Sequence, residues 1–123
     1  MDNCIFCKII KGEIPCYKIY EDEHVLAFLD VAEDYFGHTL VVPKKHFANL
    51  LETDSEYLGH VINAVQKISR HYTDDCHASG INVMNNNGEI AGQSVMHLHF
   101  HIIPRGNFKK CSLEEQKDIL ALQ

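Results

Sequence analysis

Polar and apolar residues alternate strictly along residues 97–103, which read HLHFHII. Side chains of a β-strand point alternately to its two faces, so this segment predicts a strand with three imidazoles on one face. The apolar residues of the other face are expected to point into a core: Leu98, Phe100 and Ile102. The imidazoles are expected to share a cleft, and each can be a nucleophile, a proton carrier or a metal ligand: His97, His99 and His101.

Four shorter runs rich in β-forming residues predict further strands, at residues 17–20, 24–29, 38–43 and 80–85. Pro43 is expected to end its run or to lie at a sheet edge, and the histidine strand is expected to stop at Pro104-Arg105-Gly106. Apolar residues at helical spacing predict one long helix that ends near Tyr72: Leu58, Val61, Ile62, Val65, Ile68 and Tyr72.

Two capping boxes mark expected helix starts. A Thr or Ser followed three residues later by Glu occurs at Thr53–Glu56, before the long helix, and at Ser112–Glu115, before a short C-terminal helix. Strands, then a helix, then more strands indicate an α+β fold with a mostly antiparallel sheet.

The composition is that of one globular domain spanning residues 1–123, with 46% hydrophobic and 23% charged residues. The formal net charge is −6 and no basic stripe is present, which argues against binding of long nucleic acid. No apolar run reaches the ~20 residues of a membrane span, and residues 1–4 lack the features of a secretory signal. Three of the five cysteines are scattered, so a reduced, cytoplasmic location is expected: Cys16, Cys76 and Cys111.

Cys4 and Cys7 form a CxxC pair. A CxxC turn brings two thiolates to one point and can supply half of a tetrahedral zinc site. Redox chemistry is the other common use of CxxC, but that motif normally follows a strand, and no strand is predicted before Cys4. By itself the pair leaves zinc binding and two unligated cysteines equally open.

A loop rich in Asn and Gly, residues 86–92, leads through Gln93 and Ser94 into the histidine segment. Backbone N–H groups of such a loop, with a neighbouring hydroxyl and amide, can hold a phosphate. This composition is common in loops, but its place directly before three imidazoles favours a phosphate site.

Together these residues resemble the histidine-triad (HIT) family, whose signature is His-φ-His-φ-His-φ-φ and is matched by residues 97–103. Motifs upstream follow in the expected order, at residues 4–10, 13–15, 27–30 and 38–46. The chain looks most like the Hint-like nucleoside phosphoramidases and their bacterial relatives. The resemblance implies a HIT fold and a symmetric homodimer formed through the long helix and a strand edge.

The resemblance also implies a hydrolase that acts at the α-phosphate of a purine nucleoside phosphoramidate or a related nucleotide. His99 would be the nucleophile and form a nucleotidyl-histidine, which water then hydrolyses. His101 would contact the phosphate oxygens, and Ser94 would hydrogen-bond the leaving group. His38 occupies a family position that helps to orient the triad, although a half-buried strand histidine is the plain alternative.

Two binding sites follow from the same resemblance. An apolar slot for the base, a carboxylate for the ribose hydroxyls and a phosphate loop would be formed by Ile5, Phe6, Ile9, Phe28, Leu29, Asp30, Val31, Asn86, Gln93, Ser94, His99 and His101. Leu29 stands where the best-known Hint-like members carry His. Zinc-carrying bacterial relatives imply a closed structural zinc site formed by Cys4, Cys7, His46 and His97.

Three other functions would use some of these residues. A dinucleoside polyphosphate hydrolase would use the same histidines, although Ser94 favours the phosphoramidase. A non-catalytic nucleotide-binding or scaffold protein would have no need of a nucleophile at His99. A structural zinc module would leave the nucleotide pocket unexplained. The remaining histidines are expected to be solvated: His24, His60, His71 and His77.

Overall fold

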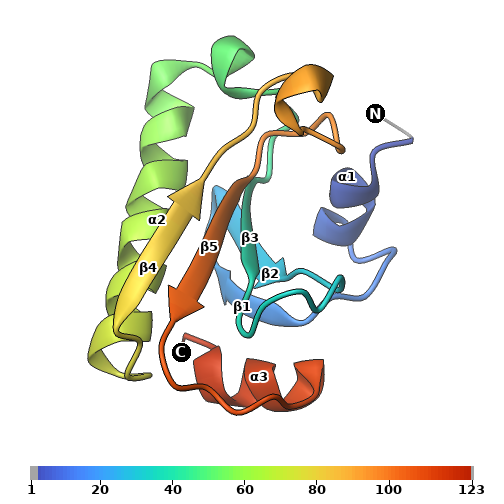
Figure 1. Ribbon diagram of the computed structural model, residues 1–123. Coiled ribbons are helices and arrows are strands. Elements are labelled where there is room, and N and C mark those ends of the chain that lie inside the picture. Colours follow the sequence, from blue (N-terminus) through green and yellow to red (C-terminus); the bar gives the residue numbers. More distant parts are fainter. Residues whose placement is uncertain (1–2, 123) are drawn as a thin grey trace.

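Five antiparallel strands form one sheet in the computed structural model, which describes residues 3–122 (Figure 1). The strands lie in the order β1-β2-β3-β5-β4, and every neighbouring pair is antiparallel. Their bounds are β1 (Lys18–Glu21), β2 (Val25–Leu29), β3 (Thr39–Pro43), β4 (Gly80–Met84) and β5 (Phe100–Arg105). The predicted α+β fold with a mostly antiparallel sheet is confirmed.

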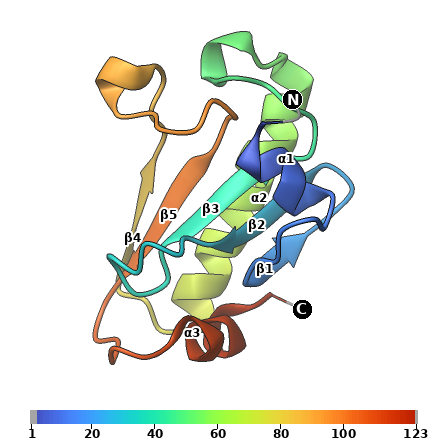
Figure 2. The same cartoon turned by 90° about the vertical axis from the view of Figure 1, so that its right-hand side faces the viewer.

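The described residues also form three α-helices, α1 (Ile5–Ile10), α2 (Ser55–Asp74) and α3 (Leu113–Leu120), and two 3-10 turns, η1 (Leu50–Glu52) and η2 (Glu89–Ala91). The long helix α2 packs along one face of the sheet, and α1 lies over the opposite face (Figures 1 and 2). The C-terminal helix α3 lies across one end of the sheet (Figure 1). Within residues 3–122, no helix has the length and apolar character that a membrane crossing requires.

Strand alternation divides the apolar side chains between two layers. The larger core cluster lies between the sheet and α2 and includes the three residues predicted to point inward: Leu98, Phe100 and Ile102. A smaller cluster lies on the opposite face, against α1: Phe6, Leu26, Phe28, Leu40 and Val42. Burial of apolar surface on both faces therefore holds the sheet between α2 and α1.

The histidine strand differs from its predicted range. Ladder pairing begins at Phe100 and continues through Pro104, which lies opposite Ile81 of β4. Strand β3 pairs with β5 only as far as Ile102, so at Pro104 the strand β5 has a neighbour on one side only, β4. Proline, which lacks an N–H group, is tolerated at such a position. The strand therefore continues through Pro104 and ends at Arg105, within the predicted stop at residues 104–106.

The two predicted capping boxes have different outcomes. The box at residues 112–115 forms and starts α3 as predicted. At α2 the cap is Asp54, whose carboxylate accepts a hydrogen bond from the Tyr57 N–H at 2.7 Å. Thr53 does not cap the helix, because its hydroxyl donates to the Asn49 carbonyl oxygen at 2.7 Å. The capping box predicted at the long helix does not form, and the capping residue lies one position later than predicted, at Asp54.

The two edges of the sheet differ in how they are covered. At β1, the C-terminal tail covers the edge, since the Leu122 N–H donates to the Ile19 carbonyl oxygen at 2.8 Å. At the other edge, β4 borders no further strand among the described residues. Two apolar side chains of β4 are about half exposed, Val83 at 49% and Met84 at 45%. An open edge with apolar side chains is a place where another strand can pair.

Candidate active site

The structure divides the three triad histidines between two groups. His97 and His99 are buried, at 0% and 6% exposure, whereas His101 is partly exposed. The rings of His99 and His101 lie side by side, with 5.0 Å between their centres. His97 turns its Nδ1 toward the thiols at the start of the chain instead.

The tautomer of His99 follows from its hydrogen bond. Its Nδ1 lies 2.8 Å from the His97 carbonyl oxygen, which can only accept, so Nδ1 carries the proton. Burial lowers the pKa of His99, and the ring is therefore neutral at neutral pH. The lone pair is then on Nε2, which is the nitrogen able to attack an electrophile.

A second pair of imidazoles joins the start of β3 to β5. His38 Nε2 lies 2.8 Å from His101 Nδ1, and His38 Nδ1 lies 2.8 Å from the Asp34 carboxylate. Because a carboxylate only accepts, His38 is protonated at Nδ1, and its Nε2 accepts the Nδ1 proton of His101. Nε2 of His101 is then the ring nitrogen left to meet a ligand. Burial, together with the neighbouring His99 and His38, lowers the pKa of His101 to about 4.

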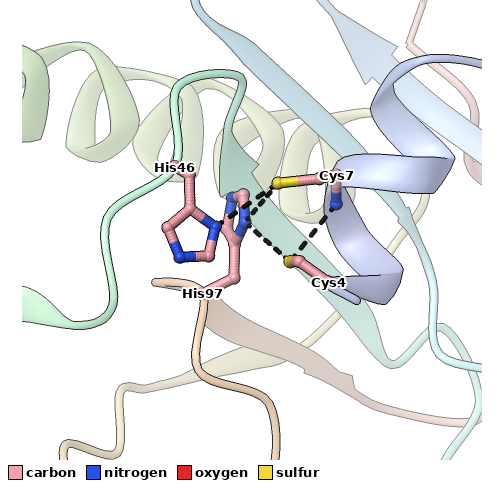
Figure 3. A group of neighbouring side chains, drawn as sticks. All are labelled: Cys4, Cys7, His46 and His97. Carbon is pink, nitrogen blue, oxygen red and sulfur yellow. Dashed lines mark hydrogen bonds between the residues drawn. The ribbon is translucent and has the colours of Figure 1, made fainter. Parts of the chain in front are cut away.

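A separate cluster brings two cysteines and two histidines around one point (Figure 3): Cys4, Cys7, His46 and His97. The CxxC pair forms the start of helix α1, which was predicted only as a turn, and Cys4 caps that helix. His46 follows β3, and His97 precedes β5. The four ligand atoms all lie within 4.8 Å of one another, so this cluster could hold a metal ion.

The donor set of this cluster fits a tetrahedral zinc ion. The Sγ–Nδ1 distances are 3.3 Å for Cys4–His97, 3.6 Å for Cys7–His97 and 3.3 Å for Cys7–His46. Zn–S bonds of ~2.3 Å and Zn–N bonds of ~2.0 Å at the tetrahedral angle separate S and N by about 3.5 Å. The His97 Nε2–H donates to the Pro43 carbonyl oxygen at 2.9 Å, so its Nδ1 is bare and faces the thiols.

The protonation of the cluster is consistent with metal binding. Burial lowers the pKa of His97 to about 4 and also lowers the pKa of His46, so both rings are neutral, as metal ligands must be. Burial raises the pKa of the Cys7 thiol, and a bound cation would offset this by favouring the thiolate.

An apolar face lies beside His99. The Phe6 ring of α1 meets the Phe28 ring edge to face, with 5.6 Å between centres, and lies 5.2 Å from the His99 ring. Ile5 is 46% exposed and Ile9 is partly exposed on the same helix. The structure thus brings together four of the residues predicted for the base site, on a face that could receive a flat apolar group.

The residues at the end of β2 point in different directions. The Asp30 side chain is 23% exposed, and its Oδ1 accepts a hydrogen bond from the Ala32 N–H at 2.9 Å. Val31 is 70% exposed. Leu29 lies in the core cluster on the α2 side, so its side chain does not line the face of Phe28. Consecutive strand residues point to opposite faces, which explains why Leu29 departs from the predicted pocket.

Gln93 braces the loop before the triad rather than facing a ligand. Its side chain is 2% exposed. The amide Nε2 donates to the carbonyl oxygens of Ala48 and Val95 at 2.7 and 3.0 Å, and Oε1 accepts from the Gly88 N–H at 2.9 Å. All of the side chain's polar atoms are therefore engaged with backbone, and its role in phosphate binding is limited to holding the loop.

Ser94 and Asn86 are the accessible members of the predicted phosphate loop. Ser94 is exposed and lines a hollow of about 430 Å³ that also reaches Ile5 and His46. Asn86 is partly exposed, and its side-chain amide lies beside Gly92, which has a φ of +95°. Neither side chain is buried, so both are accessible from the surface.

Sequence reasoning missed Asp34, although a carboxylate four residues before a histidine was a usable signal. Three of the histidines expected to be solvated also have neighbours. His24 stacks on His60 with 3.8 Å between ring centres, and His71 lies 2.8 Å from the Asp75 carboxylate. These groups lie outside the triad and the Cys/His cluster.

The fold and the site define an α+β protein that carries a histidine triad beside a Cys/His cluster. Residues 11–108 match the model of the HIT domain. The chain belongs to the HIT family.

Similar proteins include an enzyme and a zinc protein. The protein hit of Bacillus subtilis (strain 168) is 57% identical over 104 residues, which are 85% of this chain and 72% of that protein. Adenosine 5'-monophosphoramidase hnt1 of Schizosaccharomyces pombe, a hydrolase, is 46% identical over 105 residues, covering 85% and 76%. The crystal structure of a Zn-bound histidine triad family protein from Mycobacterium smegmatis matches with a TM-score of 0.86 and 38% identity, covering 97% and 91%.

Replacing the bracing amide should destabilise the protein. Gln93→Ala leaves three partly buried backbone groups without their side-chain partner, at Ala48, Gly88 and Val95, which costs about 1–3 kcal/mol in the free energy of unfolding. Urea unfolding measures this, with Ser94→Ala as the matched control, because Ser94 is exposed and its substitution should change the free energy by less than about 0.5 kcal/mol. Equal stabilities of the two variants would contradict the bracing role.

Proposed function

We propose that this chain is a nucleotide hydrolase that cleaves the P–N bond of a purine nucleoside 5'-phosphoramidate. The observation that carries the proposal is the His99 ring, which is neutral, protonated at Nδ1 by its bond to the His97 carbonyl and has its lone pair on Nε2. A ring prepared in this way has no use in a protein that only binds nucleotides. The 46% identity to an adenosine 5'-monophosphoramidase supports the same class of substrate.

The surroundings of His99 support a nucleotide as ligand. The base would lie on the apolar face of Phe6 and Phe28, next to the partly exposed carboxylate of Asp30, which can accept hydrogen bonds from ribose hydroxyls. His101, beside His99, would meet the phosphate oxygens through its Nε2. Ser94 would donate a hydrogen bond to the leaving group.

The reaction then takes two displacements. His99 Nε2 attacks the α-phosphorus, the P–N bond breaks, and the amine leaves with the bonding electron pair and takes up a proton from the solvent. Water next attacks the phosphorus of the nucleotidyl-histidine and gives a proton back to the solvent, the N–P bond to His99 breaks with its electron pair returning to Nε2, and the nucleoside monophosphate is released. Each displacement has a lower barrier than direct attack of water on the phosphoramidate.

Removal of the nucleophile should abolish turnover. An adenosine phosphoramidate with a fluorescent amine leaving group is the substrate, and His99→Ala and His99→Gly are expected to lower kcat/KM by at least about a thousandfold. His60→Ala on α2 is the control, and mass spectrometry should find the nucleotidyl adduct on His99 of the wild type. Turnover of dinucleoside polyphosphates alone, or AMP binding without any turnover, would contradict the proposal in favour of the two rival functions.

We also propose that the Cys/His cluster holds a structural zinc ion. When bound, the metal would tie α1, which carries Phe6 of the base site, to His97 and the triad segment. The support is the donor set, the bare Nδ1 of His97 and the zinc found in the similar mycobacterial protein.

Metal analysis tests the zinc site. Protein purified without chelators should contain one zinc per chain, and Cys7→Ser should lose the metal and lower Tm by at least about 5 °C. Cys111→Ser, outside the cluster, is the control and should keep the zinc and the wild-type Tm. Iron in place of zinc, or no metal at all in the wild-type protein, would refute this assignment.

We further propose that two copies pair through β4 and α2 to form a homodimer with a continuous sheet, and that the protein is cytoplasmic. Ile81 packs into the core on the α2 side, so Val83, two residues on, projects toward the same layer as the 43% exposed Ile62 of α2. The unpaired edge and these apolar groups support the dimer. The five free cysteines support a reducing compartment.

A charge at the proposed interface should separate the subunits. Sedimentation equilibrium is expected to give twice the chain mass for the wild type and the chain mass for Val83→Lys, because burying a lysine without a partner is costly. Leu51→Lys is the control, since Leu51 is 83% exposed and belongs to η1, outside both β4 and α2. A monomeric wild type would disprove the dimer.

A further inference from the structure

The carboxylate of Asp34 is the partner of the histidine that holds His101. Its Oδ1 lies 2.8 Å from His38 Nδ1, and the His38 side chain is only 7% exposed. Asp30 lies 3.6 Å from the same nitrogen, which is too far for a hydrogen bond. Within residues 3–122, Asp34 is therefore the acceptor for His38, and Asp30 is left free for other partners.

The Asp34 carboxylate carries its charge at neutral pH. Burial acts to raise the pKa of Asp34, but the hydrogen bonds that its carboxylate accepts from His38 and from backbone N–H groups outweigh this effect, and the pKa is lowered. The bond to His38 is accordingly a charge-assisted one, which is stronger than a bond between neutral groups.

The turn that carries Asp34 is held in place from the C-terminal part of the chain. The Gly37 N–H donates to Gln116 Oε1 of α3 at 2.9 Å, and the Phe36 ring stacks on Phe108 with 4.3 Å between centres. Gly37 has a φ of +70°, and a Cβ at this position would lie 2.7 Å from a Pro104 side-chain carbon. Close packing of this kind fixes the turn and limits the positions that the Asp34 carboxylate can take.

We propose that Asp34 is a positioning residue for the reaction, acting through His38 to orient His101 toward the substrate phosphate. This inference rests on the proposed function. The chain of bonds runs from the carboxylate to His38 Nδ1–H and from His38 Nε2 to His101 Nδ1–H. When an anionic phosphate is bound, the negative charge at the Asp34 end also favours a proton on His101 Nε2.

The two carboxylates near the site therefore have separate tasks. Burial and the neighbouring His99 and His38 lower the pKa of His101 to about 4, although the charges of Asp30 and Asp34 act in the opposite direction. A neutral ring protonated at Nδ1 would present a lone pair to the phosphate oxygens, whereas a ring protonated at both nitrogens presents an N–H. The Asp34 charge and the charge of a bound phosphate both favour the second form. Asp30 keeps one oxygen for a ligand, since only its Oδ1 is bonded to the Ala32 N–H.

Steady-state kinetics with the adenosine phosphoramidate test the positioning role. Asp34→Ala should lower kcat by roughly ten- to a hundredfold while KM changes by less than about threefold. Asp34→Glu, which retains a carboxylate, should keep kcat within about threefold of the wild type. Asp75→Ala is the matched control, because Asp75 bonds His71 four residues away at the same 2.8 Å but lies far from the triad in sequence. Its kcat should stay within about twofold.

Nitrogen-15 NMR of the histidine rings provides a readout that does not need turnover. The wild type should show His38 protonated at Nδ1, and Asp34→Ala should lose that signal, whereas Asp75→Ala should keep it. If Asp34→Ala does not fold, Asp34→Leu, which has a similar volume but accepts no hydrogen bond, takes its place in both measurements. A kcat within about twofold of the wild type in the Asp34 variant overturns the positioning role.

The two proposals fail in different ways. If the wild type turns over no phosphoramidate, the proposed function fails, and the NMR spectra alone decide the role of Asp34. In that case an unchanged His38 Nδ1–H signal in the Asp34 variant overturns the inference, and its loss supports it.

Discussion

The rest of the site depends on the contacts of one buried residue, His97. Its Nε2–H bonds the end of β3 at Pro43, its Nδ1 faces the thiols of Cys4 and Cys7, and its backbone carbonyl holds the Nδ1 proton of His99. One residue therefore connects the sheet, the N-terminal helix and the candidate nucleophile. Since a buried polar group must keep its hydrogen bonds, His97 cannot shift without disturbing its contacts with the sheet, with the N-terminal helix and with His99.

Acceptors that cannot donate decide which nitrogen of each imidazole is available. Backbone carbonyls hold one nitrogen of His97 and of His99, and the Asp34 carboxylate holds one nitrogen of His38. Each buried ring is thereby committed to one tautomer, with its other nitrogen turned toward a metal, a substrate or the next ring. The same side chain type thus takes three roles, because the partner of each ring differs.

Much of the architecture could be read from local patterns. Alternation placed Leu98, Phe100 and Ile102 in the core, and helical spacing located the long helix. The expectations that failed depended on partners distant in the sequence or on competition between neighbours. The ladder of the histidine strand begins only at Phe100, opposite Val41 of β3, and Thr53 does not cap because its hydroxyl donates to the Asn49 carbonyl oxygen.

The sequence by itself determined the fold class, the membership in the HIT family and the set of residues able to carry chemistry, because periodicity and motif spacing are local properties. Only the tertiary structure decided the hydrogen bonds and the packing of that set. It fixed the proton of His99 on Nδ1, placed Leu29 in the core on the α2 side, and brought Asp34 to His38. These outcomes depend on strand register and burial, which arise when segments distant in the chain pack together and each buried polar group must find a partner.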